Sequence, residues 1–178
     1  MALKATVYKA ELEISDIDRG YYGNHALTLA RHPSETEERL MIRLLAFVMH
    51  ADDRLEFGRG LSIDDEPDLW LRDDTGAIEL WIDVGLPDER RLRKAAGRSP
   101  QLALLAYGRR AMDVWWRKNS ADLRRLQSLK VWSLDDDGVA ELASLARRNM
   151  TLQCTIQEGQ IAFSDGGQYV VVQPERLE

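Results

Sequence analysis

The sequence is poor in the residues that mark secreted, membrane and zinc proteins. Its single cysteine, Cys154, cannot form an intramolecular disulfide, and its three histidines show no i, i+4 spacing of the kind that binds zinc. No stretch approaches the roughly 18 apolar residues that span a bilayer, and the N-terminus lacks the pattern of a signal peptide. We therefore expect a folded, cytoplasmic protein that does not enter a membrane.

Length and composition are those of an ordinary globular protein. The chain has 178 residues, of which 44% are hydrophobic and 30% charged, so it is far from the disordered class. A domain of this length should bury roughly 70% of the surface that its unfolded chain exposes. No linker, repeat or low-complexity segment interrupts the sequence. We predict a single domain over residues 1–178.

Charge is distributed unevenly along the chain, whose net charge is -6. Residues 88–130 contain 12 Lys or Arg against 4 Asp or Glu, a balance of +8, so the remainder carries 12 against 26, a balance of -14. Two interpretations stay open: the basic stretch is the solvated faces of two helices, or it is a surface that meets phosphate. Under the second, DNA or RNA would bind the basic segment 90–125.

The N-terminal third predicts two strands and a helix. Residues 2–14 and 22–31 alternate between apolar and polar positions and indicate a strand pair. A helix should follow from Ser34 to about His50, because Ser34 and Glu37 have the spacing of a capping box. Apolar residues recur along it at helical spacing and predict one buried face.

The rest of the chain mixes strands and helices. An extended segment at 55–61 precedes a hairpin signal, in which two strands flank the turn residues 73–76. The later elements that we predict are a helix at 86–96 ended by Gly97, a strand at 102–107, helices at 109–118 and 136–148, a strand at 129–134, and a C-terminal β-hairpin through residues 164–167. The fold class is therefore mixed α/β. Its central order is helix, three strands, helix, strand, with an extra N-terminal strand pair and a C-terminal hairpin.

The central hairpin holds two carboxylates that could lie together. If its turn has an even number of residues, Asp68 shares a face with Asp83 and lies diagonal to it, within roughly 8 Å. Two acidic side chains so placed repel each other unless a cation neutralises them, and Mg²⁺ is commonly held in this way. In the alternative interpretation, Asp68 is a strand-entry residue after Pro67, and Asp83 binds the amides of the next helix.

A third carboxylate could come from the start of the first helix. By angular position Glu37 lies near the centre of its apolar face and Glu38 at the flank, so either could turn toward the sheet. The alternatives are that Glu37 only completes the capping box and that Glu38 is a solvated side chain.

Several motifs along the whole chain closely resemble those of the bacterial YaeQ family. They are His32-Pro33-Ser34-Glu35-Thr36 with Glu38-Arg39, Arg43-Leu44-Leu45-Ala46-Phe47, Asp65-Glu66-Pro67, Leu80-Trp81-Ile82, Pro87-Asp88-Glu89, and Met150-Thr151-Leu152 with Thr155-Ile156-Gln157. The resemblance implies a variant of the PD-(D/E)XK nuclease fold, whose core has the order helix, three strands, helix, strand.

The same resemblance implies a metal site and exposes a gap in it. Asp68, after a proline, and Asp83 match the nuclease carboxylates, and Glu38 is the implied helix ligand for Mg²⁺ or Mn²⁺. Nuclease sites carry a lysine two positions after the second carboxylate, where it stabilises developing charge, but this chain has Gly85 there. Lys94, on the following helix, is the candidate for a migrated lysine. In the alternative interpretation, Lys94 is a surface lysine among arginines.

Two functions of different class follow. The first is a metal-dependent nuclease in which Glu38, Asp68 and Asp83 hold the ion and Lys94 supports phosphate. The second is a catalytically inactive nuclease fold that binds nucleic acid or protein, as Gly85 favours. The first requires carboxylates that are open to an ion; carboxylates already bound by amides or arginines would favour the second.

Overall fold

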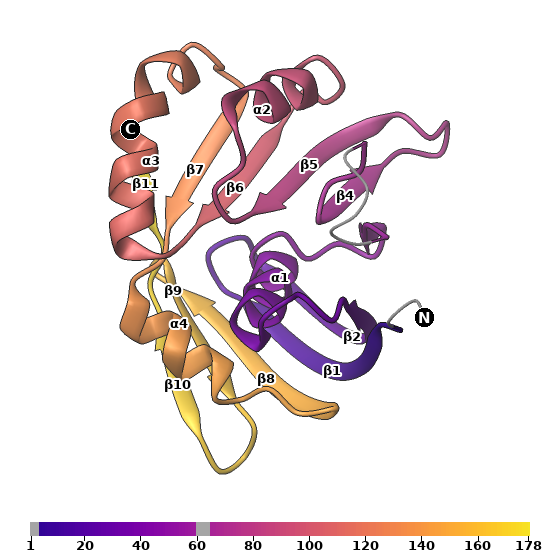
Figure 1. Ribbon diagram of the computed structural model, residues 1–178. Helices are drawn as coiled ribbons and strands as arrows, with labels where there is room; N and C mark the ends of the chain where they lie inside the picture. The colour runs from indigo at the N-terminus through magenta and orange to yellow at the C-terminus, as the bar shows by residue number, and fades with distance from the viewer. Residues whose placement is uncertain (1–3, 60–64) are drawn as a thin grey trace. The chain divides into compact units, whose positions relative to one another are not determined.

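The computed structural model describes residues 4–59 and 65–178 (Figure 1). Within these residues the chain forms four helices and two mixed sheets, of five and six strands. The ends of two predicted segments, at 2–3 and 60–61, lie outside the described residues. The chain divides into two compact units, Met1–Asp53 with Asp137–Pro174 and Arg54–Asp136 with Glu175–Glu178. That both units form one domain stays a prediction.

The first unit contains the five-stranded sheet. Its strands, in spatial order, are β10 (Tyr169–Val172), β9 (Gln160–Ser164), β8 (Asn149–Gln157), β1 (Thr6–Asp16) and β2 (Tyr21–Arg31). The predicted N-terminal strand pair is confirmed as β1 and β2, which pair antiparallel over their whole length, and the C-terminal hairpin is confirmed as β9 and β10. β8 was not predicted. It pairs parallel with β1 and so joins the two ends of the sequence in one sheet.

Helix α1 (Glu37–Met49) begins later than the sequence predicted. Thr36 is its N-cap and accepts a hydrogen bond from the Arg39 amide at 3.1 Å. The capping box at Ser34 is wrong, because the Ser34 hydroxyl and amide are hydrogen-bonded to the His32 ring instead. The apolar face is confirmed, and burial extends further, since every residue from 40 to 48 is buried. Arg43 is among them.

The second unit contains the six-stranded sheet. Its strands, in spatial order, are β11 (Glu175–Leu177), β7 (Leu129–Ser133), β6 (Leu102–Ala106), β5 (Ile78–Val84), β4 (Leu69–Arg72) and β3 (Leu55–Phe57). The predicted hairpin is confirmed as β4 and β5, and β5, β6 and β7 run parallel. Helix α2 (Glu89–Ala96) connects β5 to β6, and α3 (Arg109–Leu123) connects β6 to β7. α3 is longer than predicted. α4 (Asp136–Ala143), which belongs to the first unit from Asp137 onward, is shorter than predicted.

The two connecting helices cover one face of this sheet. Leu92 of α2 and Trp115 of α3 are buried in the same apolar cluster as Trp81, Leu104 and Val131, which share a face of β5, β6 and β7. Right-handed strand, helix, strand units produce this layered packing. Asp83 has the same parity as Trp81 along β5 and therefore belongs to the helix-covered face.

The order of elements from α1 to β6 is helix, three strands, helix, strand, as predicted. α1 belongs to the first unit and the other five elements to the second. Among the described residues, no helix is both long enough and apolar enough to cross a bilayer.

Candidate functional site

The structure places the two predicted carboxylates of the second unit opposite each other, at the start of β4 and near the end of β5. Leu69 lies opposite Ile82 where β4 pairs antiparallel with β5. Continuing this register by one residue places Asp68, which immediately precedes β4, opposite Asp83. The sequence predicted the shared face but a diagonal relation. The difference is one of register, which sequence fixes only through the turn.

Both carboxylates are bound by groups of the protein. Asp68 Oδ2 accepts a hydrogen bond from the Val84 amide at 2.7 Å. Asp83 is buried, and both its oxygens accept from the Arg91 guanidinium, Oδ2 from Nε at 2.8 Å and Oδ1 from Nη2 at 3.0 Å. Such a two-bond pair is the strongest and most directional contact between these side chains. We call Asp68, Asp83 and Arg91 the carboxylate–arginine cluster.

Arg91 reaches Asp83 because of where α2 begins. Asp88 is the N-cap, and its carboxylate accepts from the Arg91 amide at 2.9 Å, which sets the first turn just beyond the end of β5. Arg91 Nη2 also donates to the Glu66 carbonyl at 2.8 Å, and its guanidinium lies 5.7 Å from the centre of the Trp81 ring. Sequence reasoning missed this role. The available signal was an arginine in the first turn of a helix that follows the acidic strand directly.

Gly85 has a conformation that a lysine would not adopt easily. Its φ is +109°, in the region where a residue with a Cβ is strained, although a Cβ added there would meet no other atom within 4 Å. Its amide donates to the Leu105 carbonyl at 2.9 Å, so the backbone is held in this form. The backbone therefore accounts for a glycine at the position where the nuclease pattern has lysine.

Lys94 makes an ion pair away from the two predicted carboxylates. Its Nζ lies 2.5 Å from Asp65 Oδ1, and both side chains are well exposed, 62% and 72%. The hydrogen bond from Lys94 is the main cause that lowers the pKa of Asp65, followed by the charge attraction. Arg98, which follows α2, donates to the Asp65 carbonyl as well, so α2 and the turn after it hold the segment that leads into Asp68.

A close backbone approach fixes the other side of this segment. The Gly58 amide donates to the Asp68 carbonyl at 2.9 Å. A Cβ at position 58 would lie 2.0 Å from the Pro67 carbonyl oxygen, a distance that side chains essentially never show, so only glycine fits. Arg59 and Glu66 close the same segment with an ion pair, and Arg59 is the main cause that lowers the pKa of Glu66.

The predicted ion site does not fit the arrangement of these side chains. Arg91 takes both oxygens of Asp83, and the Val84 amide takes one of Asp68, so an ion would have to displace them. Across residues 4–59 and 65–178, no group of three or more Asp, Glu, His or Cys side chains is arranged to hold a metal. Glu38 lies exposed in the first turn of α1, in the first unit. Its membership of the site stays a prediction.

The predicted basic segment presents cations to solvent. Its exposed members on the two helices and the turns after them are Arg90, Arg93, Lys94, Arg98, Arg109, Arg110, Arg117, Lys118, Arg124 and Arg125. Several are engaged in local contacts, such as Arg125 with Asp122. Arg90, Arg110 and Lys118 pair with no acidic side chain in the described part of the chain. We call the outward side of α3, with Arg110, Arg117 and Lys118, the basic face.

The chain matches the family model described as YaeQ protein over residues 1–174. The chain belongs to the YaeQ family. An uncharacterized YaeQ protein of Salmonella typhi is 51% identical over 97% of this chain and 96% of its own length, and one of Escherichia coli (strain K12) is 52% identical over 93% and 91%.

Two solved YaeQ structures have the same fold. The crystal structure of the YaeQ protein from Xanthomonas axonopodis pv. citri has a TM-score of 0.94 at 52% identity and covers 98% of both chains. That of the YaeQ protein from Pseudomonas syringae has a TM-score of 0.93 at 38% identity, over 98% of this chain and 96% of the other. The resemblance that the sequence motifs indicated is thus confirmed at the level of the family.

Proposed function

We propose that this chain binds nucleic acid through the basic face of α3 and that its nuclease-type carboxylates stabilise the second unit rather than catalyse hydrolysis. The observation that carries the proposal is the basic face itself. Arg110, Arg117 and Lys118 are exposed, and Arg110 and Lys118 have no acidic partner in the described part of the chain. Unpaired arginines and lysines on one helix side are the groups that bind phosphate.

The spacing on α3 suits an extended polyanion. Arg110 and Arg117 are seven residues apart, so they lie on the same side of the helix and about 10 Å apart along its axis. Arg124, seven residues further, continues the row at the end of the helix. The rest of the chain carries a balance of -14, so phosphate would be steered to this face and repelled elsewhere.

The carboxylate–arginine cluster argues for binding without hydrolysis. In the nuclease pattern that the family resemblance implies, the second carboxylate must be open to a metal ion and followed by a lysine. Here Asp83 is bound on both oxygens by Arg91, and Gly85 stands at the lysine position. A buried carboxylate needs such a partner, because an unpaired charge in the interior costs several kcal/mol. The pair therefore has a structural reason.

The test is the salt dependence of nucleic-acid binding. A fluorescent single-stranded oligonucleotide should bind the wild type, and Arg110→Gln or Arg117→Gln should each weaken binding and reduce the slope of log affinity against log salt by about 1. Lys9→Gln is the matched control, since Lys9 is exposed on β1 in the first unit and its loss should leave the slope unchanged. Equal slopes for all variants would contradict the proposal.

A second candidate, metal-dependent hydrolysis of nucleic acid, is favoured by one observation. Asp68, which precedes β4, lies opposite Asp83 of β5, where Mg²⁺ or Mn²⁺ could bind if Arg91 moved away, with Lys94 toward phosphate. Calorimetric titration with Mn²⁺ distinguishes the candidates. We expect no saturable binding to the wild type. Binding that Asp83→Asn abolishes and Arg91→Gln strengthens, with metal-dependent cleavage, would favour hydrolysis.

A further inference from the structure

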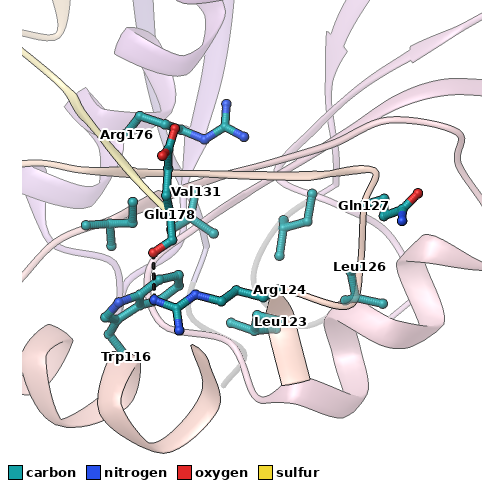
Figure 2. A pocket seen from close by; sticks show the side chains of 10 residues that line it. Trp116, Leu123, Arg124, Leu126, Gln127, Val131, Arg176 and Glu178 are labelled. Atoms are coloured by element: carbon teal, nitrogen blue, oxygen red, sulfur yellow. Dashed lines mark hydrogen bonds between the residues drawn. The ribbon is translucent and has the colours of Figure 1, made fainter. Parts of the chain in front are cut away.

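A cavity lies at the C-terminal end of α3, within the second unit. Its volume is about 320 Å³, and the chain around it comes from α3, the turn before β7, β7 itself and β11 (Figure 2). Leu123, Leu129 and Val131 form its apolar floor and are buried. The size is at the lower end of the range for small-molecule sites.

Polar and aromatic groups surround this floor. Figure 2 shows the Arg124 guanidinium between the Trp116 ring and Glu178, where Arg124 Nη2 donates to the Glu178 main-chain oxygen at 2.7 Å. The guanidinium lies 5.7 Å from the centre of the Trp116 ring. Gln127 also lines the cavity and is exposed. The cavity thus combines an apolar interior with donors and acceptors at its opening.

We infer that this cavity takes an unstacked base of a single-stranded nucleic acid, which rests on and deepens the function proposed above. A nucleobase is a planar, largely apolar ring system with hydrogen-bonding groups on its edge. The apolar floor and the indole of Trp116 fit the ring, because bases stack well on aromatic side chains. Arg124, Gln127 and the Glu178 carboxylate supply donors and acceptors for the edge.

Arg124 belongs both to the lining of the cavity and to the row of arginines on α3. Trp116 is adjacent in sequence to Arg117, and Arg124 is the next member of the row that contains Arg110 and Arg117. A strand whose phosphates follow this row reaches the cavity at the end of α3, where a base can leave the stack. Duplex DNA or RNA keeps its bases stacked, so it can use the row but not the cavity.

Charge complementarity favours a base on a phosphate backbone over an apolar peptide side chain. The exposed Arg110, Arg117 and Arg124 of α3 and its C-cap lead to the opening, and a polyanion is attracted along that row. A hydrophobic peptide would fill the floor equally well but would gain nothing from the cations. The test therefore asks whether the bases of an oligonucleotide, and not only its phosphates, contribute to binding.

The experiment compares two oligonucleotides of equal length and charge. One is a single strand of mixed bases, and the other has the same backbone with every base replaced by an abasic analogue. We expect the wild type to prefer the strand with bases by about tenfold, which is the effect of stacking one base on an aromatic side chain. Gln127→Ala and Leu126→Trp, which narrows the cavity, should reduce the preference and leave binding of the abasic strand unchanged.

Gln101→Ala is the matched control, because the Gln101 side chain is exposed in the same unit and lies outside the cavity. Circular dichroism establishes whether each variant folds. If Leu126→Trp does not fold, Gln127→Ala by itself tests the inference. Equal wild-type affinity for both strands, with a salt slope that still depends on Arg117, overturns the inference and leaves the proposed function. Binding to neither strand overturns both. An unchanged preference in Gln127→Ala and Leu126→Trp also overturns the inference.

Discussion

Two buried carboxylates, Glu35 of the first unit and Asp83 of the second, each bind one arginine through both oxygens, and these two pairs differ in how completely they are enclosed. In the first unit Arg43 binds both oxygens of Glu35, at 2.8 and 2.9 Å, and the two side chains are only 4% and 2% exposed. In the second unit Arg91 binds both oxygens of Asp83, but Arg91 is 27% exposed while Asp83 is 3% exposed. The same chemistry therefore occurs in a closed and a partly open form.

The surroundings of the two pairs differ as well. Arg43 also donates to the Ala30 carbonyl, and Arg39 gives Glu35 a second cation, so the acid is surrounded by donors from the helix that follows it. Asp83 instead lies opposite a second carboxylate, Asp68. A pair that is buried and hydrogen-bonded on all sides stabilises the fold. A pair whose arginine is partly exposed and lies near a second carboxylate can also bind a ligand.

The largest expected effect is at the closed pair. Arg43→Ala leaves the Glu35 carboxylate buried with only Arg39 beside it, so we expect the free energy of unfolding to fall by about 3–5 kcal/mol. Urea denaturation at pH 7 measures the loss. The double variant Glu35→Leu/Arg43→Met is the control, because replacing both charges by apolar groups of similar size removes the unpaired charge and should recover most of the stability. A loss from Arg43→Ala below about 1 kcal/mol would contradict the enclosed structure of this pair.

A smaller effect is expected at the open pair. Arg91→Ala removes the cation from Asp83, but water can reach the space that Arg91 leaves, so we expect a loss of about 2–3 kcal/mol. Arg90→Ala, at the exposed neighbouring position, should change stability by less than about 0.5 kcal/mol. If Arg91→Ala cost as much as Arg43→Ala, the distinction between open and closed pairs would not hold.

Burial in the first unit also predicts an unreactive thiol. Cys154 on β8 is 1% exposed, and burial raises its pKa from 9.0 to about 12. The folded thiol should therefore stay protonated and react with iodoacetamide only in urea. Since the unfolded thiol ionises at lower pH, its contribution to stability is complete below about pH 9 and is lost as the pH rises toward 12. Cys154→Ala should lack this part of the pH dependence.

The sequence predicted the second unit better than the first. The hairpin, α2 and β6 could be located because turn residues, an N-cap and a short apolar run each mark a local structure. β8 was missed, although its buried and exposed residues alternate along the whole strand. Its pairing with β1 joins residues about 140 positions apart, and no local pattern reports such a contact.

The sequence predicted the acidic residues of the candidate site but not the arginine that binds them. Asp68 and Asp83 could be brought together from strand alternation alone. Arg91 was missed because which of several arginines on α2 reaches Asp83 depends on the first residue of that helix, and sequence leaves helix boundaries uncertain by a few residues. The Glu35–Arg43 pair was missed for the same reason. The sequence placed Glu35 inside the first helix, whereas the structure begins that helix after its N-cap Thr36.

The smallest effect on stability is expected at Lys94 of the second unit, which the nuclease pattern suggested as the lysine that supports phosphate. Its partner Asp65 is exposed, and water solvates both charges once the pair is broken, so Lys94→Ala should leave the urea midpoint at pH 7 unchanged. Because Lys94 is the main cause of the lowered pKa of Asp65, the substitution should raise that pKa, which NMR titration of the Asp65 carboxyl would detect. A lowered carboxyl pKa adds stability above its range, and that stability is lost as the pH falls through it. The contribution of this exposed pair, which solvent keeps too small to shift the urea midpoint, therefore belongs to pH 7 and disappears in acid. A loss at pH 7 as large as that of Arg91→Ala would mean that Lys94, and not Arg91 alone, neutralises the carboxylates beside β5.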